Sequence, residues 1–279
     1  MIGIDFGHSI THVALLERGM VRKTLSVPSD KFSLIHLQKF LKGVRRQTRV
    51  GVTGGSEKKR KEFIGQLKNH GNQIFKKLGL NAIQIDELEA IAAGASKLAG
   101  RKNFVVANVG TGTPILIVRG RSFEHCTGTD LGGGFIQGLG RLLTGKDVEK
   151  VERISKKGDQ KLDILVKEIV GKKGIGPLTG DLTAASFGKA HKAKGIRHED
   201  LSHSLFTVVG NNVGQLVELV ARYEGIKSLV FTGGVIARSR VLRERLKTNL
   251  KGHKVIFPNF GEHCTAVGAA LKASKRGKR

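Results

Sequence analysis

The chain has 279 residues, of which 39% are hydrophobic, and its formal net charge is +26. This length and apolar content suit a packed core, which argues against a disordered chain, and no apolar run is long enough to cross a membrane. Two cysteines are too few for a disulfide framework or a metal site, and the first residues lack a secretory-signal pattern, so we expect a cytoplasmic protein without a membrane partner.

The first hundred residues predict strands that alternate with helices. Residues 2–6 and 11–16 are apolar runs joined by the polar turn 7–9, which is typical of a hairpin. Farther along, the spacing of apolar residues predicts helices over 32–41, 63–78 and 88–99 and strands over 49–52 and 82–85.

The remaining residues continue the alternation. We expect strands over 104–109, 115–118, 122–126, 228–231 and 254–257 and helices over 132–143, 200–223, 238–250 and 266–273. The apolar spacing of 200–223 fits either a core helix or a dimer face. Strand–glycine-turn–strand patterns near residues 1 and 101 suggest an α/β protein of two similar lobes with mixed sheets, one over 1–100 and the other over 101–279.

The positive charge is concentrated in residues 39–61, 146–173 and 272–279. Such clusters can bind nucleic acid by neutralising its phosphates, or they can be a solvated surface that attracts anionic substrates such as ATP. Aromatic residues make up only 5% of the chain, with no tryptophan, so few rings are available to stack on bases. We favour the solvated surface and keep nucleic acid as a possible but less favoured partner.

Four glycine-rich turns follow predicted strands. They are DFGHS at 5–9, NVGTGT at 108–113, GTDLGGG at 128–134 and TGG at 232–234. Glycine lets backbone N–H groups approach a phosphate, and a glycine run at a helix start adds the positive end of the helix dipole. One such turn is more often a plain tight turn, but four at strand ends favour a polyphosphate site. None has the Gly-Lys-Ser/Thr ending of a Walker A loop.

Acidic residues stand at two places where phosphoryl transfer needs them. Asp5 ends the first strand, where a carboxylate can hold Mg²⁺ beside phosphates or can cap the turn. Asp86, Glu87 and Glu89 lie where a strand meets a helix, and a carboxylate there can take a proton from a substrate hydroxyl or complement the helix dipole. Composition does not choose among the three.

Four runs resemble type II pantothenate kinases. They are ANVGTGT at 107–113, TGTDLGGGFIQGLGRLLTG at 127–145, KGDQKLDILV at 157–166 and GDLTAASFGKA at 180–190. The resemblance extends in order over nearly the whole chain. It implies the acetate/sugar kinase–Hsc70–actin (ribonuclease H-like) fold, with ATP and Mg²⁺ between two lobes, and a homodimer. It also implies phosphorylation of pantothenate to 4′-phosphopantothenate, the first step of coenzyme A biosynthesis.

The same resemblance assigns roles to residues. Glu87 takes the place of the catalytic base, and Thr111 and His125 fall at the substrate. Nucleotide contacts fall on Asp5 (also the metal ligand), Gly7, His8, Ser9, His12, Gly110, Gly112, Thr129, Gly132, Gly133, Gly134, Gly233 and Gly234.

Three positions depart from the family pattern. His8 stands where the family usually has the second glycine of the first turn, His12 where it has a lysine, and His125 where it has an arginine. A side chain at position 8 restricts the loop, which a glycine would not. Arginine is always charged and presents a rigid fork, whereas histidine is neither at neutral pH unless its surroundings favour the cation. The chain is therefore expected to be a pantothenate kinase, with two alternatives. One is a related kinase with another acceptor, and the other is a non-catalytic sensor of nucleotides or coenzyme A that binds nucleic acid or a partner.

Overall fold

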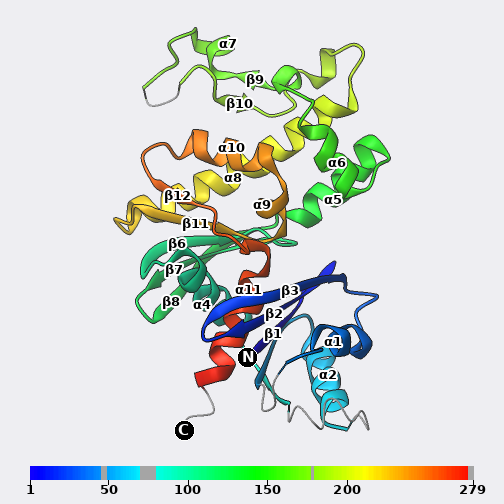
Figure 1. Ribbon diagram of the computed structural model, residues 1–279. Coiled ribbons are helices and arrows are strands. Elements are labelled where there is room, and N and C mark those ends of the chain that lie inside the picture. Colours follow the sequence, from blue (N-terminus) through cyan, green and yellow to red (C-terminus); the bar gives the residue numbers. More distant parts are fainter. Residues whose placement is uncertain (45–48, 70–79, 177–178, 276–279) are drawn as a thin grey trace.

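The computed structural model describes residues 1–44, 49–69, 80–176 and 179–275. Two five-stranded sheets form the framework, and helices lie between them and on their outer faces (Figure 1). Among the described helices, none combines the length and the apolar character that crossing a bilayer would need.

The first sheet lies near the N-terminus. Its strands are β1 (Ile2–Phe6), β2 (Ile10–Glu17), β3 (Met20–Pro28), β4 (Arg49–Gly54) and β5 (Asn81–Gln84). The order is β3-β2-β1-β4-β5, with β1 antiparallel to β2 and parallel to β4. The predicted hairpin at the start of the chain is confirmed.

Strand β3 was not predicted from the sequence, because it is an edge strand without a regular apolar pattern. Met20 at its start is 65% exposed, and Arg22 and Lys23 follow. The turn that joins β2 to β3 is nevertheless of a recognisable type. Arg18 and Gly19 both have positive φ, 49° and 76°, which is typical of a two-residue hairpin turn.

The second sheet has the same topology as the first. Its strands are β6 (Asn103–Asn108), β7 (Thr113–Arg119), β8 (Ser122–Thr129), β11 (Ser228–Thr232) and β12 (Lys254–Ile256). In the order β12-β11-β6-β7-β8, an antiparallel run of three strands is extended by two parallel ones, as in the first sheet. The duplication suggested by the glycine turns is therefore visible in strand order, whereas the predicted boundary at residue 100 stays a prediction.

Helices and a small ribbon complete the chain. The helices are α1 (Leu34–Phe40), α2 (Glu57–Asn69), α4 (Glu87–Ala99), α5 (Gly133–Thr144), α6 (Val148–Ser155), α7 (Val166–Val170), α8 (His198–Tyr223), α9 (Gly234–Arg238), α10 (Arg240–Asn249) and α11 (Cys264–Lys275). The ribbon pairs β9 (Ile164–Leu165) with β10 (Thr183–Ala185).

Several helices differ from expectation. Helix α2 begins at Glu57 rather than at 63, and residues 70–78 of that prediction lie outside the described residues. Helices α6, α7 and α9 were not predicted. The predicted helix over 238–250 corresponds to α10, which begins at Arg240 because Ser239 is its N-cap: the Ser239 Oγ accepts a hydrogen bond from the Leu242 N–H at 3.2 Å.

Helices α4 and α11 pack against each other between the two sheets (Figure 1). Glycines allow the close crossing, because a Cβ at Gly94 would collide with the carbonyl of Cys264 and one at Gly268 with that of Ala90. Helix α11 also packs on β1 and β4 of the first sheet, where Gly3 makes the same kind of room. Helix α11 is therefore built into the first sheet's layer, although it is far from those strands in the sequence.

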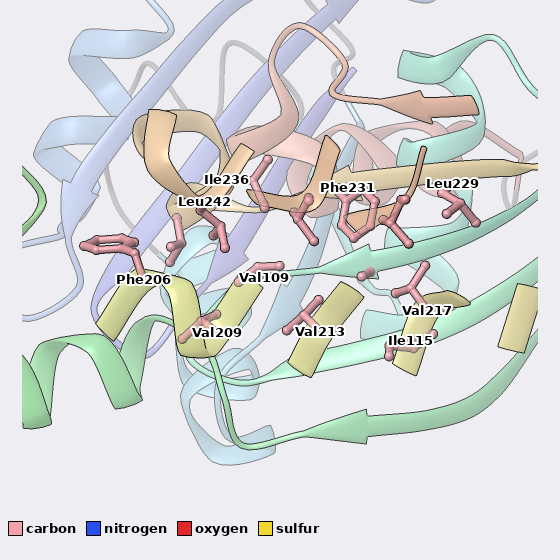
Figure 2. Packing of buried hydrophobic residues seen from close by; sticks show 14 of the residues in the cluster. Val109, Ile115, Phe206, Val209, Val213, Val217, Leu229, Phe231, Ile236 and Leu242 are labelled. Atoms are coloured by element: carbon pink, nitrogen blue, oxygen red, sulfur yellow. The ribbon is translucent and has the colours of Figure 1, made fainter. Parts of the chain in front are cut away.

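Helix α8 forms the core beneath the second sheet. Its buried side chains face the strands in Figure 2. The facing residues are Phe206, Val209, Val213 and Val217 on α8 and Val109, Ile115, Leu229 and Phe231 on and beside the sheet. Of the two interpretations of this helix, core packing therefore accounts for its apolar stripe.

Candidate active site

Turns from both sheets surround one cavity of about 760 Å³. All but one of the predicted site residues line it, and the exception is Gly132. The lining residues among them are Asp5, Gly7, His8, Ser9, His12, Glu87, Gly110, Thr111, Gly112, His125, Thr129, Gly133, Gly134, Gly233 and Gly234. Residues that are far apart in the sequence thus meet at one place because two equivalent sheets present their strand ends to each other.

The first turn is held by the end of β3. Ser29 Oγ donates a hydrogen bond to the Gly7 carbonyl at 2.7 Å, and the Ser29 N–H donates to the Ser9 carbonyl at 2.9 Å. Asp5 precedes this turn on β1. Burial, and after it the negative charge of Glu87, raises the pKa of the Asp5 carboxyl to about 7. The turn is therefore a fixed structure with an acid at its base.

The glycine turn at the end of β4 makes room for the Asp5 side chain. Gly54, at the end of β4, has φ of 70°, and a Cβ at this position would collide with Asp5 Oδ1. Arg60 from α2 fixes the turn by donating to the carbonyls of Gly54 at 2.8 Å and Gly55 at 2.6 Å. The positive charge of Arg60 also counteracts the rise in the pKa of Glu87.

The structure separates the three acids at the start of α4. The Asp86 side chain is the N-cap and accepts from the Glu89 N–H at 2.9 Å. Glu89 forms an ion pair with Lys272 at 2.8 Å. Only Glu87 of the three lines the cavity, and burial raises the pKa of its carboxyl. A proton acceptor directed at the cavity is thus available at this one position of the helix.

The glycines at the start of α5 serve close packing against the turn after β6. The Gly133 N–H donates to the Gly110 carbonyl at 2.6 Å, and the Gly134 N–H donates to the Thr111 carbonyl at 2.9 Å. Gly132 lies behind this contact, where a Cβ would stand 2.7 Å from the Thr111 oxygen. The N–H groups of Thr111 and Gly112, by contrast, make no hydrogen bond with other described residues. Phosphate contact by the three α5 glycines stays a prediction.

The glycine turn at 232–234 is joined to the turn after β6. Gly233 has φ of 100°, and a Cβ there would collide with the Val109 carbonyl. Thr232 Oγ1 donates to Asn108 Oδ1 at 2.9 Å, and the Val109 N–H donates to the Thr232 carbonyl at 2.8 Å. Only glycine at 233 permits this approach of two backbones, so the two turns form one wall of the cavity.

His12 belongs to a polar chain that the sequence did not predict. Its Nδ1 lies 2.9 Å from Ser26 Oγ, which lies 3.1 Å from His263 Nε2. His263 Nδ1 in turn lies 3.4 Å from Glu262 Oε1. Burial, followed by the nearby His263, lowers the pKa of His12 to about 4, so this imidazole is neutral at pH 7.

Two further charged residues line the cavity without having been predicted, Arg238 and Glu262. The neighbouring His263 side chain lowers the pKa of Glu262 to about 2. Arg238 ends α9, and its Nε lies 3.6 Å from Glu152 Oε2. Neither residue follows a recognisable motif. The strand-to-helix turn before α9 was the one signal that pointed towards Arg238.

Two of the runs that carry the family resemblance meet each other rather than the cavity. Gln160 Nε2 donates to Thr183 Oγ1 at 3.0 Å, and the Phe187 N–H donates to Asp163 Oδ1 at 2.9 Å. They build the β9–β10 ribbon, which lies beyond α8 at the far end of the molecule from the first sheet (Figure 1).

Solved structures with the same fold include enzymes and an enzyme component. The (R)-2-hydroxyglutaryl-CoA dehydratase component A of Acidaminococcus fermentans superposes with a TM-score of 0.71 at 18% identity, covering 100% of this chain and 99% of that one. A ROK family glucokinase from Streptomyces griseus, solved with glucose and AMPPNP, gives 0.60 at 13% identity and covers 99% of both chains. These likenesses confirm the predicted fold class.

Sequence comparisons identify the family. A family model described as Fumble matches residues 102–272. The type II pantothenate kinase of one Bacillus cereus strain is 30% identical over 99% of this chain and 98% of its own length. That of Oceanobacillus iheyensis is 29% identical over 98% of this chain and 99% of its own. Because the model matches more than half of the chain and these relatives match nearly all of it, the chain belongs to the Fumble family of type II pantothenate kinases.

Proposed function

We propose that the protein is a pantothenate kinase, which transfers the γ-phosphoryl group of ATP to the primary hydroxyl of pantothenate and releases ADP and 4′-phosphopantothenate. Family membership supports this activity. The observation that carries it in this chain is the cavity in which four glycine turns and the carboxylates of Asp5 and Glu87 meet.

ATP lies with its phosphates on the turns that follow β1 and β6. The N–H groups of Thr111 and Gly112 are directed to no protein carbonyl among the described residues and are suited to phosphate oxygens. The adenosine end extends to Gly233 and Gly234, which form the adjoining wall. Gly7, His8 and Ser9 bound the phosphates from the other sheet.

Mg²⁺ fits this arrangement through Asp5. Its carboxylate is a hard oxygen ligand, and the repulsion from Glu87 that raises its pKa would be relieved by a divalent cation. The described residues contain no cluster of three or more side chains that could hold a metal alone. This fits an ion that keeps several waters and is shared with phosphates, as Mg²⁺ usually is. When bound, it neutralises phosphate charge during transfer.

Glu87 acts as the base. The pantothenate hydroxyl oxygen attacks the γ-phosphorus, the bond to the β-phosphate oxygen breaks, and Glu87 accepts the hydroxyl proton. Its raised pKa brings its basicity closer to neutral pH than that of an unperturbed glutamate. Thr111 and His125 hold the acceptor in this proposal, which is supported by their position in the cavity wall on the second sheet's side.

The molecule works as a cytoplasmic homodimer in this proposal. Both cysteines are free thiols, which suits a reducing compartment. On α8, Leu219 is 66% exposed and Tyr223, one turn later, is 88% exposed, which gives the helix an apolar outer edge for a second copy. In this proposal the substrates lie between the lobes over 1–100 and 101–279, with α11 of the second packed on the first sheet.

Release of ADP from purified protein with Mg·ATP tests the function. We expect release that depends on pantothenate and a product that co-elutes with 4′-phosphopantothenate. Release of ADP with another alcohol but not with pantothenate would mean that the protein is a kinase with a different acceptor. His125 would then be the residue to vary. No release with any acceptor, together with nucleic acid that is removed by salt, would support the non-catalytic alternative instead.

A further inference from the structure

The cavity contains little positive charge of its own. Among the described residues that line it, Arg238 is the only lysine or arginine, whereas three are acids: Asp5, Glu87 and Glu262. The protein as a whole carries a formal net charge of +26. Phosphate oxygens form their strongest hydrogen bonds with charged donors, so a polyphosphate site favours a local cation in addition to any metal ion.

His12 is a poor candidate for that cation. Its Nδ1 lies 2.9 Å from Ser26 Oγ, which in turn lies 3.1 Å from His263 Nε2. A histidine also lacks the permanent charge of the lysine that the resemblance leads us to expect at this position. Arg238 lines the same cavity as His12.

The guanidinium of Arg238 is built into the last glycine turn. Its Nη1, Nη2 and Cζ atoms lie 3.2, 3.5 and 3.7 Å from the point where a Cβ at Gly234 would stand. The glycine thus leaves the space in which the planar group lies. On the other side, Nε is 3.6 Å from Glu152 Oε2 of α6, whose side chain is only 14% exposed. The Arg238 side chain remains 43% exposed, so its terminal donors are accessible.

We propose that Arg238 binds the phosphate chain of the nucleotide and supplies the fixed positive charge that His12 does not. The inference rests on the proposed use of ATP and adds a residue to that site. A guanidinium suits this function because its donors form a rigid fork that matches phosphate oxygens. Glu152 is a positioning residue, since it holds Nε and leaves the Nη groups for the ligand.

Calorimetric titration with Mg·ATP and with adenosine tests the proposal. Arg238→Gln is expected to raise the Kd for Mg·ATP by roughly 10–100-fold, because a charged hydrogen-bond pair is lost, and to leave the Kd for adenosine within about twofold. Arg238→Lys keeps the charge without the fork and should fall between Arg238→Gln and the unmodified protein. It also serves as the second variant if Arg238→Gln does not fold.

Arg240→Gln is the matched control. Arg240 lies two residues away, is 73% exposed and pairs with Glu244 at 2.6 Å, so the variant removes the same net charge outside the cavity. Its Kd for Mg·ATP should stay within about twofold. Adding His12→Lys to Arg238→Gln should recover at least about tenfold in affinity, since it restores a charge at the first turn.

Three results would overturn the proposal: equal weakening by Arg238→Gln and Arg240→Gln, equal loss of adenosine and Mg·ATP affinity, or no recovery with His12→Lys. Failure of the proposed function looks different. Unmodified protein that binds Mg·ATP but releases no ADP with pantothenate would disprove the kinase activity while the Arg238 comparison still gave its answer.

Discussion

Glu87 differs from Asp86 and Glu89 in where its side chain lies, since all three residues are acids. Three acids lie within four residues, but Asp86 caps α4 and Glu89 pairs with Lys272, which leaves Glu87 at the cavity. We expect Glu87→Gln to lower kcat by roughly 10²–10⁴-fold, because the proton acceptor is lost, with a Kd for Mg·ATP that changes little. Single-turnover rates and nucleotide titration measure the two effects. Glu89→Gln on the same helix is the control, and a kcat for Glu87→Gln equal to that control would remove Glu87 as the base.

The buried carboxylate of Asp5 makes the stability of the folded protein depend on pH. Its pKa is raised from 3.8 to about 7, so the folded protein binds more protons than the unfolded chain between these values. Stability contributed by this group is therefore present below about pH 4 and is lost as pH rises towards 7. Asp5→Asn should raise Tm at pH 8 by about 3 °C or more and lose the advantage near pH 4. Melting curves of both proteins at the two pH values measure this, and a variant that is less stable at pH 8 would contradict it.

The sequence located most of the cavity wall at this scale, for a physical reason. A backbone that must approach another backbone closely needs glycine, and Gly133 and Gly233 meet this requirement, since a Cβ at either position would collide with a neighbouring carbonyl oxygen. Arg238 and Glu262 carry no such mark, since they reach the cavity only through the tertiary packing of α9 and the segment before α11. His12 was noticed only because a lysine was expected in its place.

At the scale of elements, the helix pair α4–α11 connects the two sheets. Gly268 lies at the crossing, where a Cβ would collide with the carbonyl of Ala90, whereas Gly65 in α2 has nothing within 4 Å of its own Cβ position. Gly268→Ala should lower Tm by at least about 5 °C through overpacking. Gly65→Ala should leave Tm unchanged or raise it by a few degrees, because alanine favours helix. Thermal melts of the two variants measure these changes in Tm. Similar Tm values for both would show that the helix crossing tolerates a methyl group.

The elements that could be predicted are those whose own residues encode their burial. Strands such as β6 and helix α8 are continuous or periodic in apolar residues, because each buries a face against the core. Strand β3 lies at a sheet edge and α6 is short and half-exposed, so neither has that pattern. Close crossings such as α4–α11 depend on glycines that are indistinguishable in sequence from those of turns.

At the scale of the whole molecule, the net charge of the chain differs in sign from the balance of charged residues that line the cavity. The formal net charge is +26, yet the described lining of the cavity contains three acids and one arginine. Most of the positive charge therefore lies outside the site, where it can attract ATP at a distance without contacting it. Such a field is screened within about 10 Å at 0.1 M salt, whereas contacts inside a closed cavity are screened much less.

This difference gives a prediction for salt. Raising ionic strength from about 20 to 300 mM should lower kcat/KM for Mg·ATP by roughly 10-fold or more, because encounter slows, while kcat changes by less than about twofold. Initial rates with saturating pantothenate measure both parameters. A kcat/KM that does not respond to salt would mean that the basic surface does not steer ATP. In that case, ultraviolet spectra of protein purified at low salt should reveal bound nucleic acid, since the same clusters would then serve a polyanionic partner rather than the substrate.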